Sequence, residues 1–126
     1  MLKMSYAHME QNWKADCPAR AISTLLDVPY DEASELLMAH TTYHPNSGVS
    51  VREFALLMES LGMEYVEARV RLTSKNAEAR LPRKGILLFS EHVTTIKDGT
   101  LYDTFPTFSR AGCKQTTGYW IEGGQA

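Results

Sequence analysis

Hydrophobic residues recur with helical spacing in three segments of the first half of the chain. The first segment begins at Cys17, and similar patterns follow over residues 31–39 and 50–61. The apolar positions of the first segment are Ala21, Ile22, Leu25 and Leu26. Residues three and four positions apart share one face of a helix, so the pattern predicts three amphipathic helices. Ser50 and Glu53 have the spacing of a capping box at the start of the third helix.

The pattern changes to short strands in the second half of the chain. Residues 86–89 form an apolar run, and residues 92–97 form a second candidate strand. Asp98-Gly99 is a strong two-residue hairpin signal, so residues 100–105 are predicted to return antiparallel to that strand. The remaining predicted elements are strands at residues 63–71 and 118–121 and a helical turn at residues 77–80.

A two-residue loop would fix the register of this hairpin. Thr95 would face Tyr102, and Thr94 would face Asp103. His92 would then be a diagonal neighbour of Asp103 on one face of the hairpin. Such diagonal pairs lie about 7–8 Å apart, within reach of long side chains. The hairpin therefore predicts an imidazole and a carboxylate close to one another.

The face that would carry His92 also carries apolar side chains. These are Ile96, Leu101 and Phe105. An apolar sheet face is normally buried against another layer of structure, so we expect this face to pack against the predicted helices. That packing would bring His92 toward the helix that begins at Cys17.

Three helices followed by a mainly antiparallel sheet predict an α+β fold. The chain has 126 residues, of which 44% are hydrophobic, so we expect a single domain over residues 1–126. The net charge of −2 predicts no strong attraction to nucleic acids or membrane surfaces. The sequence contains no apolar stretch long enough to span a bilayer.

Cys17 stands where a reactive thiol is expected. It lies at the predicted start of the first helix, and Pro18 is favoured at the first helical position. The positive end of a helix dipole stabilises an anion, so thiolates at helix N-termini have lowered pKa values. The alternative is that Cys17 is buried and packs as a small hydrophobic residue.

The two cysteines of the chain, Cys17 and Cys113, are too few for a disulfide framework. The N-terminal residues also contain no apolar signal core. Both observations favour a reducing compartment. We therefore expect a cytoplasmic protein of a bacterium or, for a viral protein, one that works in the cytoplasm of the host.

Four residues in the order Gln, Cys, His, Asp provide the groups that a cysteine hydrolase needs. Gln11 lies six positions before Cys17, and His92 and Asp103 follow on neighbouring predicted strands. A nucleophilic thiol needs a base, the base needs an orienting group, and the developing oxyanion needs a donor. This arrangement resembles the papain-like cysteine peptidase superfamily. The compact layout is similar to the small C39-like and Josephin-like domains of that superfamily.

The resemblance implies a fold and a role for each residue. Helices would pack on a mainly antiparallel sheet, with the nucleophile Cys17 at the start of the first helix. His92 would be the general base and acid, Asp103 would orient it, and Gln11 would donate its side-chain amide to the oxyanion. Asn12 is a second candidate for this donor, and its alternative role is that of a turn or capping residue.

The sequence thus predicts a hydrolase of amide or isopeptide bonds, that is, a peptidase, isopeptidase or amidase. Its substrate would be a peptide or protein, and no cofactor is predicted. Two alternatives stay open, a transglutaminase-like acyltransferase and a catalytically silent papain-fold module that binds or inhibits a partner.

Other ligands are not expected from the sequence. His40 and His44 have a spacing that would suit a metal on one helix face, but Pro45 argues against a helix there. No metal is therefore predicted. Neither a nucleic acid nor a membrane is predicted as a partner, and the oligomeric state is left open.

Overall fold

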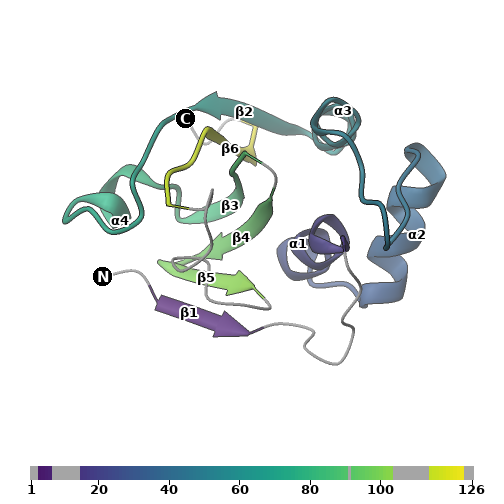
Figure 1. Cartoon of the computed structure of the whole chain (residues 1–126), viewed down its shortest axis with the longest axis horizontal. Helices are drawn as coiled ribbons and strands as arrows, with labels where there is room; N and C mark the ends of the chain where they lie inside the picture. Colours follow the sequence, from purple (N-terminus) through teal and green to yellow (C-terminus); the bar gives the residue numbers. More distant parts are fainter. Residues whose placement is uncertain (1–2, 7–14, 91, 104–113, 124–126) are drawn as a thin grey trace.

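The computed structural model describes residues 3–6, 15–90, 92–103 and 114–123. The helices in these residues are α1 (Cys17–Leu26), α2 (Tyr30–His40), α3 (Val51–Ser60) and α4 (Ala77–Arg80). The strands are β1 (Lys3–Tyr6), β2 (Met63–Glu67), β3 (Lys84–Leu88), β4 (Val93–Lys97), β5 (Thr100–Asp103) and β6 (Gly118–Glu122). Figure 1 shows α1, α2 and α3 on one side of the strands and α4 on the other. The predicted α+β fold class is confirmed.

The strands form one six-stranded sheet with the order β1-β5-β4-β3-β6-β2. All neighbouring strands are antiparallel except β1 and β5, which run parallel to each other. The mainly antiparallel sheet is therefore as predicted. The edge strand β1 is an addition, because the hydrophobic pattern predicts no element at residues 3–6.

The helices and the hairpin follow the local sequence closely. α1 begins at Cys17, and α2 and α3 begin and end within one residue of their predicted ranges. Asp98 and Gly99 have φ angles of 50° and 80°, which is the left-handed conformation of a type I′ hairpin turn. The predicted register is confirmed where the strands pair, with Thr95 opposite Tyr102. The predicted strand at residues 92–97 starts at Val93, so His92 lies just outside it.

Each face of the sheet carries a hydrophobic core of its own. The core against α1, α2 and α3 includes the sheet residues Ile86, Leu88, Val93 and Trp120. The core on the opposite face contains Val70, Leu72, Ala77, Leu81, Leu87, Phe89, Ile96 and Leu101. The sheet is thus the middle layer of the molecule. The segment around α4 covers the face that α1, α2 and α3 do not.

This arrangement corrects one prediction. Ile96 and Leu101 do not pack against α1 to α3, because they belong to the core around α4. The side of β4 that faces α1 carries Thr95, whose hydroxyl donates a 2.6 Å hydrogen bond to the carbonyl oxygen of Ala21. A threonine is counted as polar in a hydrophobic pattern, yet it is fully buried here because its hydroxyl has a partner. The prediction that the hairpin face with Ile96 and Leu101 packs against α1 to α3 is therefore wrong.

Candidate active site

The candidate nucleophile Cys17 is the first residue of α1 and is half-buried. Asp16 precedes it in the cap position, and Pro18 follows it at the start of the helix. The first N–H groups of a helix have no partner within the helix, so they are available to an anion at this end. The thiol therefore lies at the positive end of the α1 dipole, as the sequence predicts.

Cys17 and His92 line the same pocket, which has a volume of about 340 Å³. The other residues that line it are Pro18, Val49, Ser50, Val51, Phe54, Leu88, Ser90 and Val93. They come from the start of α1, the start of α3, and the ends of β3 and β4 that face one another. The pocket therefore combines a thiol and an imidazole with mainly apolar walls.

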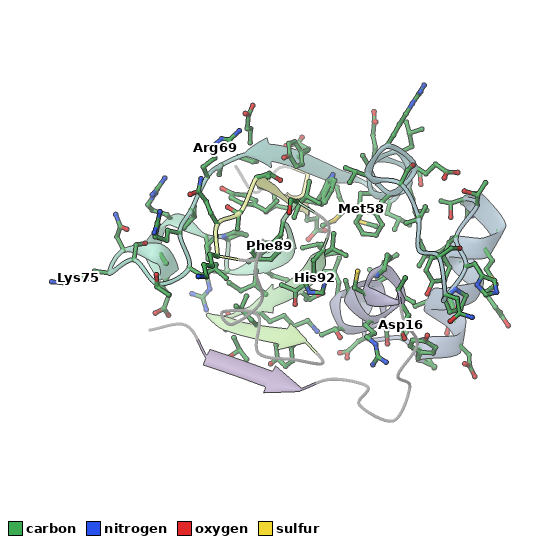
Figure 2. All side chains as sticks on the ribbon, in the orientation of Figure 1. Asp16, Met58, Arg69, Lys75, Phe89 and His92 are labelled. Carbon is green, nitrogen blue, oxygen red and sulfur yellow. The ribbon has the colours of Figure 1, made fainter. Side chains whose placement is uncertain are left out.

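His92 is fixed by the connection between β3 and β4. It is only 4% exposed, and its carbonyl oxygen accepts a 2.8 Å hydrogen bond from the N–H of Phe89. The imidazole stacks on the Phe89 ring, with 6.2 Å between the ring centres and 26° between the planes. Figure 2 shows the two residues near the centre of the molecule. Phe89 belongs to the core around α4, so His92 contacts that core. His92 also lines the pocket of Cys17, which lies beside the core of α1, α2 and α3.

The remaining candidate residues are only partly covered by the structure. Asp103 is the last residue of β5 and is paired with Tyr6 of β1, but its side chain lies outside the described residues. Gln11, Asn12, Phe105 and Cys113 also lie outside the described residues. Of the four residues that the resemblance identifies, the structure thus brings Cys17 and His92 to one pocket and leaves the others as predictions.

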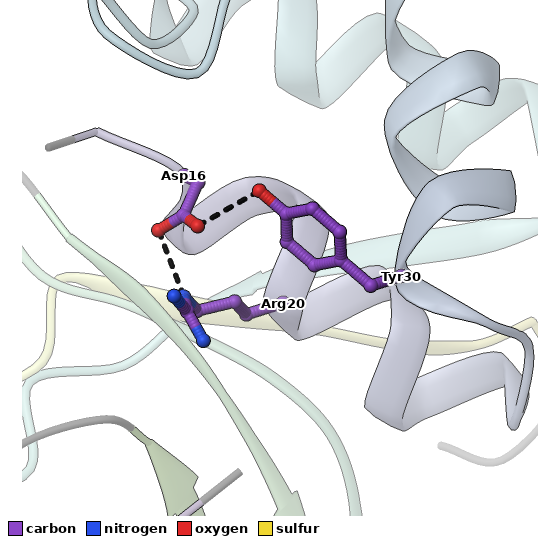
Figure 3. Close-up of polar contacts among 3 residues, drawn as sticks. All are labelled: Asp16, Arg20 and Tyr30. Carbon is purple, nitrogen blue, oxygen red and sulfur yellow. Dashed lines mark hydrogen bonds and ion pairs between the residues drawn. The ribbon is translucent and has the colours of Figure 1, made fainter. Parts of the chain in front are cut away.

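A buried polar network next to Cys17 was not predicted (Figure 3). The Asp16 carboxylate forms a 2.8 Å ion pair with Nε of Arg20 and accepts a 2.8 Å hydrogen bond from the hydroxyl of Tyr30. The Arg20 guanidinium also lies 5.7 Å from the centre of the Tyr30 ring, within cation–π distance. The available sequence signal was the spacing of four between Asp16 and Arg20, which suits an ion pair on one helix turn.

Two tyrosines stay neutral beside this network. Burial raises the pKa of the Tyr30 hydroxyl, and its hydrogen bond to Asp16 raises the pKa further. Burial also raises the pKa of Tyr43, and the nearby Tyr30, Asp16 and Cys17 add to that increase. Tyr43 is 4% exposed and lies in the loop after α2. The surroundings of Cys17 thus hold two phenols, a carboxylate and a guanidinium as well as the imidazole.

Two further properties of the described residues concern metal ions and membrane spans. His40 ends α2, whereas His44 lies in the following loop, where its Nδ1 accepts a hydrogen bond from the N–H of Asn46. Within those residues, no three histidine, cysteine or acidic side chains are grouped so that they could hold a metal ion. None of the helices described is long and apolar enough to cross a membrane.

No protein family, curated protein or solved structure matches the chain. The geometry of the pocket and the order of Gln11, Cys17, His92 and Asp103 are therefore the features that indicate a function.

Proposed function

We propose that the chain is a thiol-dependent hydrolase of the papain-like type, with Cys17 as its nucleophile and His92 as its base. The observation that carries this proposal is the pocket of about 340 Å³ that the two residues share. The position of Cys17 as the first residue of α1 supports it, because a helix N-terminus favours the thiolate. The burial of His92 and its stacking on Phe89 restrict the movement of the imidazole.

The proposed reaction has two stages. In the first, the imidazole of His92 takes the thiol proton, and the sulfur attacks the carbonyl carbon of an amide bond. The imidazolium then gives the proton to the departing amine, which leaves an acyl group on Cys17. In the second stage, His92 takes a proton from water and the resulting hydroxide attacks the thioester carbonyl. The C–S bond then breaks, and the imidazolium returns its proton to the sulfur, which releases the carboxylic acid and the free thiol.

The oxyanion of each stage needs hydrogen-bond donors. The backbone N–H of Cys17 is one candidate, because the first N–H groups of α1 have no partner within the helix. The side-chain amide of Gln11 is the proposed second donor. Asp103 is proposed to orient His92, in the role that the resemblance to papain-like enzymes assigns to it. A peptide or protein is the proposed substrate.

Electrophilic probes test whether Cys17 is the nucleophile. We expect iodoacetamide to label Cys17 much faster than Cys113 at neutral pH, because the helix N-terminus and His92 favour the thiolate. The label at each site is measured by mass spectrometry of peptides from the folded protein. Cys113→Ala is the matched control and should keep the fast labelling, whereas Cys17→Ala should lose it. Equal rates at the two cysteines would contradict the proposal.

Product analysis separates hydrolysis from the two alternatives. A peptide library is incubated with the protein, with and without a primary amine, and the products are identified by mass. Carboxylic acid products in both samples support hydrolysis. Amide products that form only with the added amine indicate an acyltransferase. Peptides that bind to the protein and are recovered unchanged would indicate a binding module.

A further inference from the structure

The charged side chains next to Cys17 in the sequence are buried and paired with each other. Asp16 directly precedes the cysteine, and Arg20 follows it by three positions. Their side chains are only 5% and 6% exposed, although both groups are charged. Each carboxylate oxygen has a partner, Arg20 Nε for Oδ1 and the Tyr30 hydroxyl for Oδ2 (Figure 3). Because Tyr30 is the first residue of α2, the network also ties the start of α1 to the start of α2.

Helix capping does not explain this arrangement. The Asp16 side chain forms no capping hydrogen bond to the N–H groups of α1, although aspartate is among the best capping residues. Buried ion pairs also add little net stability, because removing two charges from water costs about as much as their attraction returns. Unlike two apolar residues, this pair places a negative and a positive charge at the start of α1, where Cys17 is the first residue.

We propose that Asp16 and Arg20 set the ionisation of the Cys17 thiol, and that Tyr30 adjusts their balance. The carboxylate opposes a thiolate next to it, and the guanidinium favours one. The Tyr30 hydroxyl disperses the negative charge of the carboxylate and so weakens its effect on the sulfur. The inference rests on the proposed role of Cys17 as nucleophile, and Asp16, Arg20 and Tyr30 are positioning residues in it.

Other groups near the thiol also bear on its ionisation. Tyr43, from the loop after α2, stays neutral because burial raises the pKa of its hydroxyl. His92, from the connection between β3 and β4, favours the thiolate when it is protonated. The start of α3 contributes the uncharged side chains of Ser50, Val51 and Phe54 to the pocket. Among these groups and those of the network, Asp16 and Arg20 are the ones that carry a fixed charge.

The test is the pH profile of Cys17 alkylation by iodoacetamide, measured in a Cys113→Ala background so that one thiol reacts. Asp16→Asn keeps the shape and one acceptor for Arg20 but removes the negative charge. We expect it to lower the midpoint of the profile by about one pH unit. Tyr30→Phe removes only the hydroxyl. We expect it to raise the midpoint by about half a unit, which is about a threefold lower labelling rate at pH values below the midpoint.

Thr116→Val is the matched control for a lost buried hydrogen bond. Thr116 is 1% exposed, and its hydroxyl donates to the carbonyl oxygen of Ala68 in the region of the other core. This variant should lower stability without moving the midpoint. Thermal unfolding of each variant accompanies the alkylation series. A loss of stability without a shift of the midpoint is the behaviour expected of a purely structural role.

Midpoint shifts of opposite sign in Asp16→Asn and Tyr30→Phe support the proposal. Unchanged midpoints, or shifts of the same sign, overturn it and leave the network a structural role only. If Asp16→Asn does not fold, Tyr30→Phe decides alone, and an unchanged midpoint overturns the proposal. Failure of the hydrolase proposal is distinguishable, because it appears as absent turnover in the unmodified protein whatever the alkylation profiles show.

Discussion

Two helices begin at the same pocket, and their first turns are built differently. The pocket is lined by Cys17 and Pro18 from α1 and by Ser50 and Val51 from the start of α3. At α3, the hydroxyl of Ser50 accepts a 3.2 Å hydrogen bond from the N–H of Glu53. That is the usual way to satisfy a free N–H group at a helix start. The start of α3 is therefore an ordinary structural cap.

The start of α1 lacks the corresponding side-chain cap. Asp16 stands in the cap position, but its carboxylate is bound to Arg20 and Tyr30 instead. The first turn of α1 also contains no acidic residue, whereas that of α3 contains Glu53. A residue that is well suited to cap a helix can therefore bind other side chains instead of the N–H groups of that helix. The N-terminus of α1 then remains available to a negative charge, which is what a thiolate or an oxyanion requires.

The largest expected effect comes from removing the proposed reacting groups at α1. Cys17→Ala and His92→Ala should each lower turnover by more than about 10⁴-fold, because removing one member of a catalytic pair costs about as much activity as removing both. Asp103→Asn should reduce turnover less, since an amide can still orient the imidazole. Turnover is measured with a substrate found in the library screen, and circular dichroism checks each fold. A His92→Ala variant with near-normal turnover would remove His92 from the proposed mechanism.

The next effect concerns the oxyanion that forms at the start of α1. Losing one oxyanion donor typically lowers turnover by about 10²- to 10³-fold, and we expect that decrease for Gln11→Ala. Iodoacetamide labelling of Cys17 should be largely retained, because alkylation forms no oxyanion. Asn12→Ala is the neighbouring control and should change little. A normal Gln11→Ala variant beside an impaired Asn12→Ala variant would transfer the role to Asn12.

Local sequence signals account for much of the fold. The Asp98-Gly99 turn fixed the hairpin because the left-handed turn and the register depend on those two residues and their neighbours. The cap at Ser50 is predictable for the same reason. By contrast, β1 pairs with β5, which is about one hundred residues later in the sequence. No local pattern reveals such a pairing.

The site shows the same division between local and distant contacts. The position of Cys17 at a helix start is a local property and was predicted. Its approach to His92 was expected for a wrong reason, because the face with Ile96 packs on the core around α4. His92 reaches the pocket from the connection just before β4, where strand alternation no longer applies. The hydrogen bond from Tyr30 to Asp16 joins different helices, so helical spacing alone could not predict it.

A smaller effect is expected at the ordinary cap of α3. Ser50→Ala removes the hydroxyl that accepts from the Glu53 N–H, so the free energy of unfolding should decrease by about 1 kcal/mol. Because Ser50 also lines the pocket of Cys17, the alkylation rate of Cys17 is measured on the same variants to separate an effect on the pocket from the loss of the cap. Ser47→Ala, in the exposed loop before α3, is the matched control for both measurements. Equal stability of the two variants in chemical denaturation would show that the cap contributes nothing.

The smallest expected effect is the pH dependence of the same turn of α3. The side chain of Glu53 accepts hydrogen bonds from the hydroxyl and the N–H of Thr42, and these contacts lower the pKa of Glu53 below its ordinary value of 4.5. A carboxyl group whose pKa is lower in the folded state stabilises the fold above its unfolded pKa and loses that contribution as the pH falls. The melting temperature of the unmodified protein should therefore exceed that of Glu53→Gln at neutral pH. The difference should shrink as the pH falls below 4.5.

Glu59→Gln, on the exposed side of the last turn of α3, is the matched control and should not show this pattern. A difference that stays constant through the acidic range would mean that the charge of Glu53 does not stabilise the start of α3.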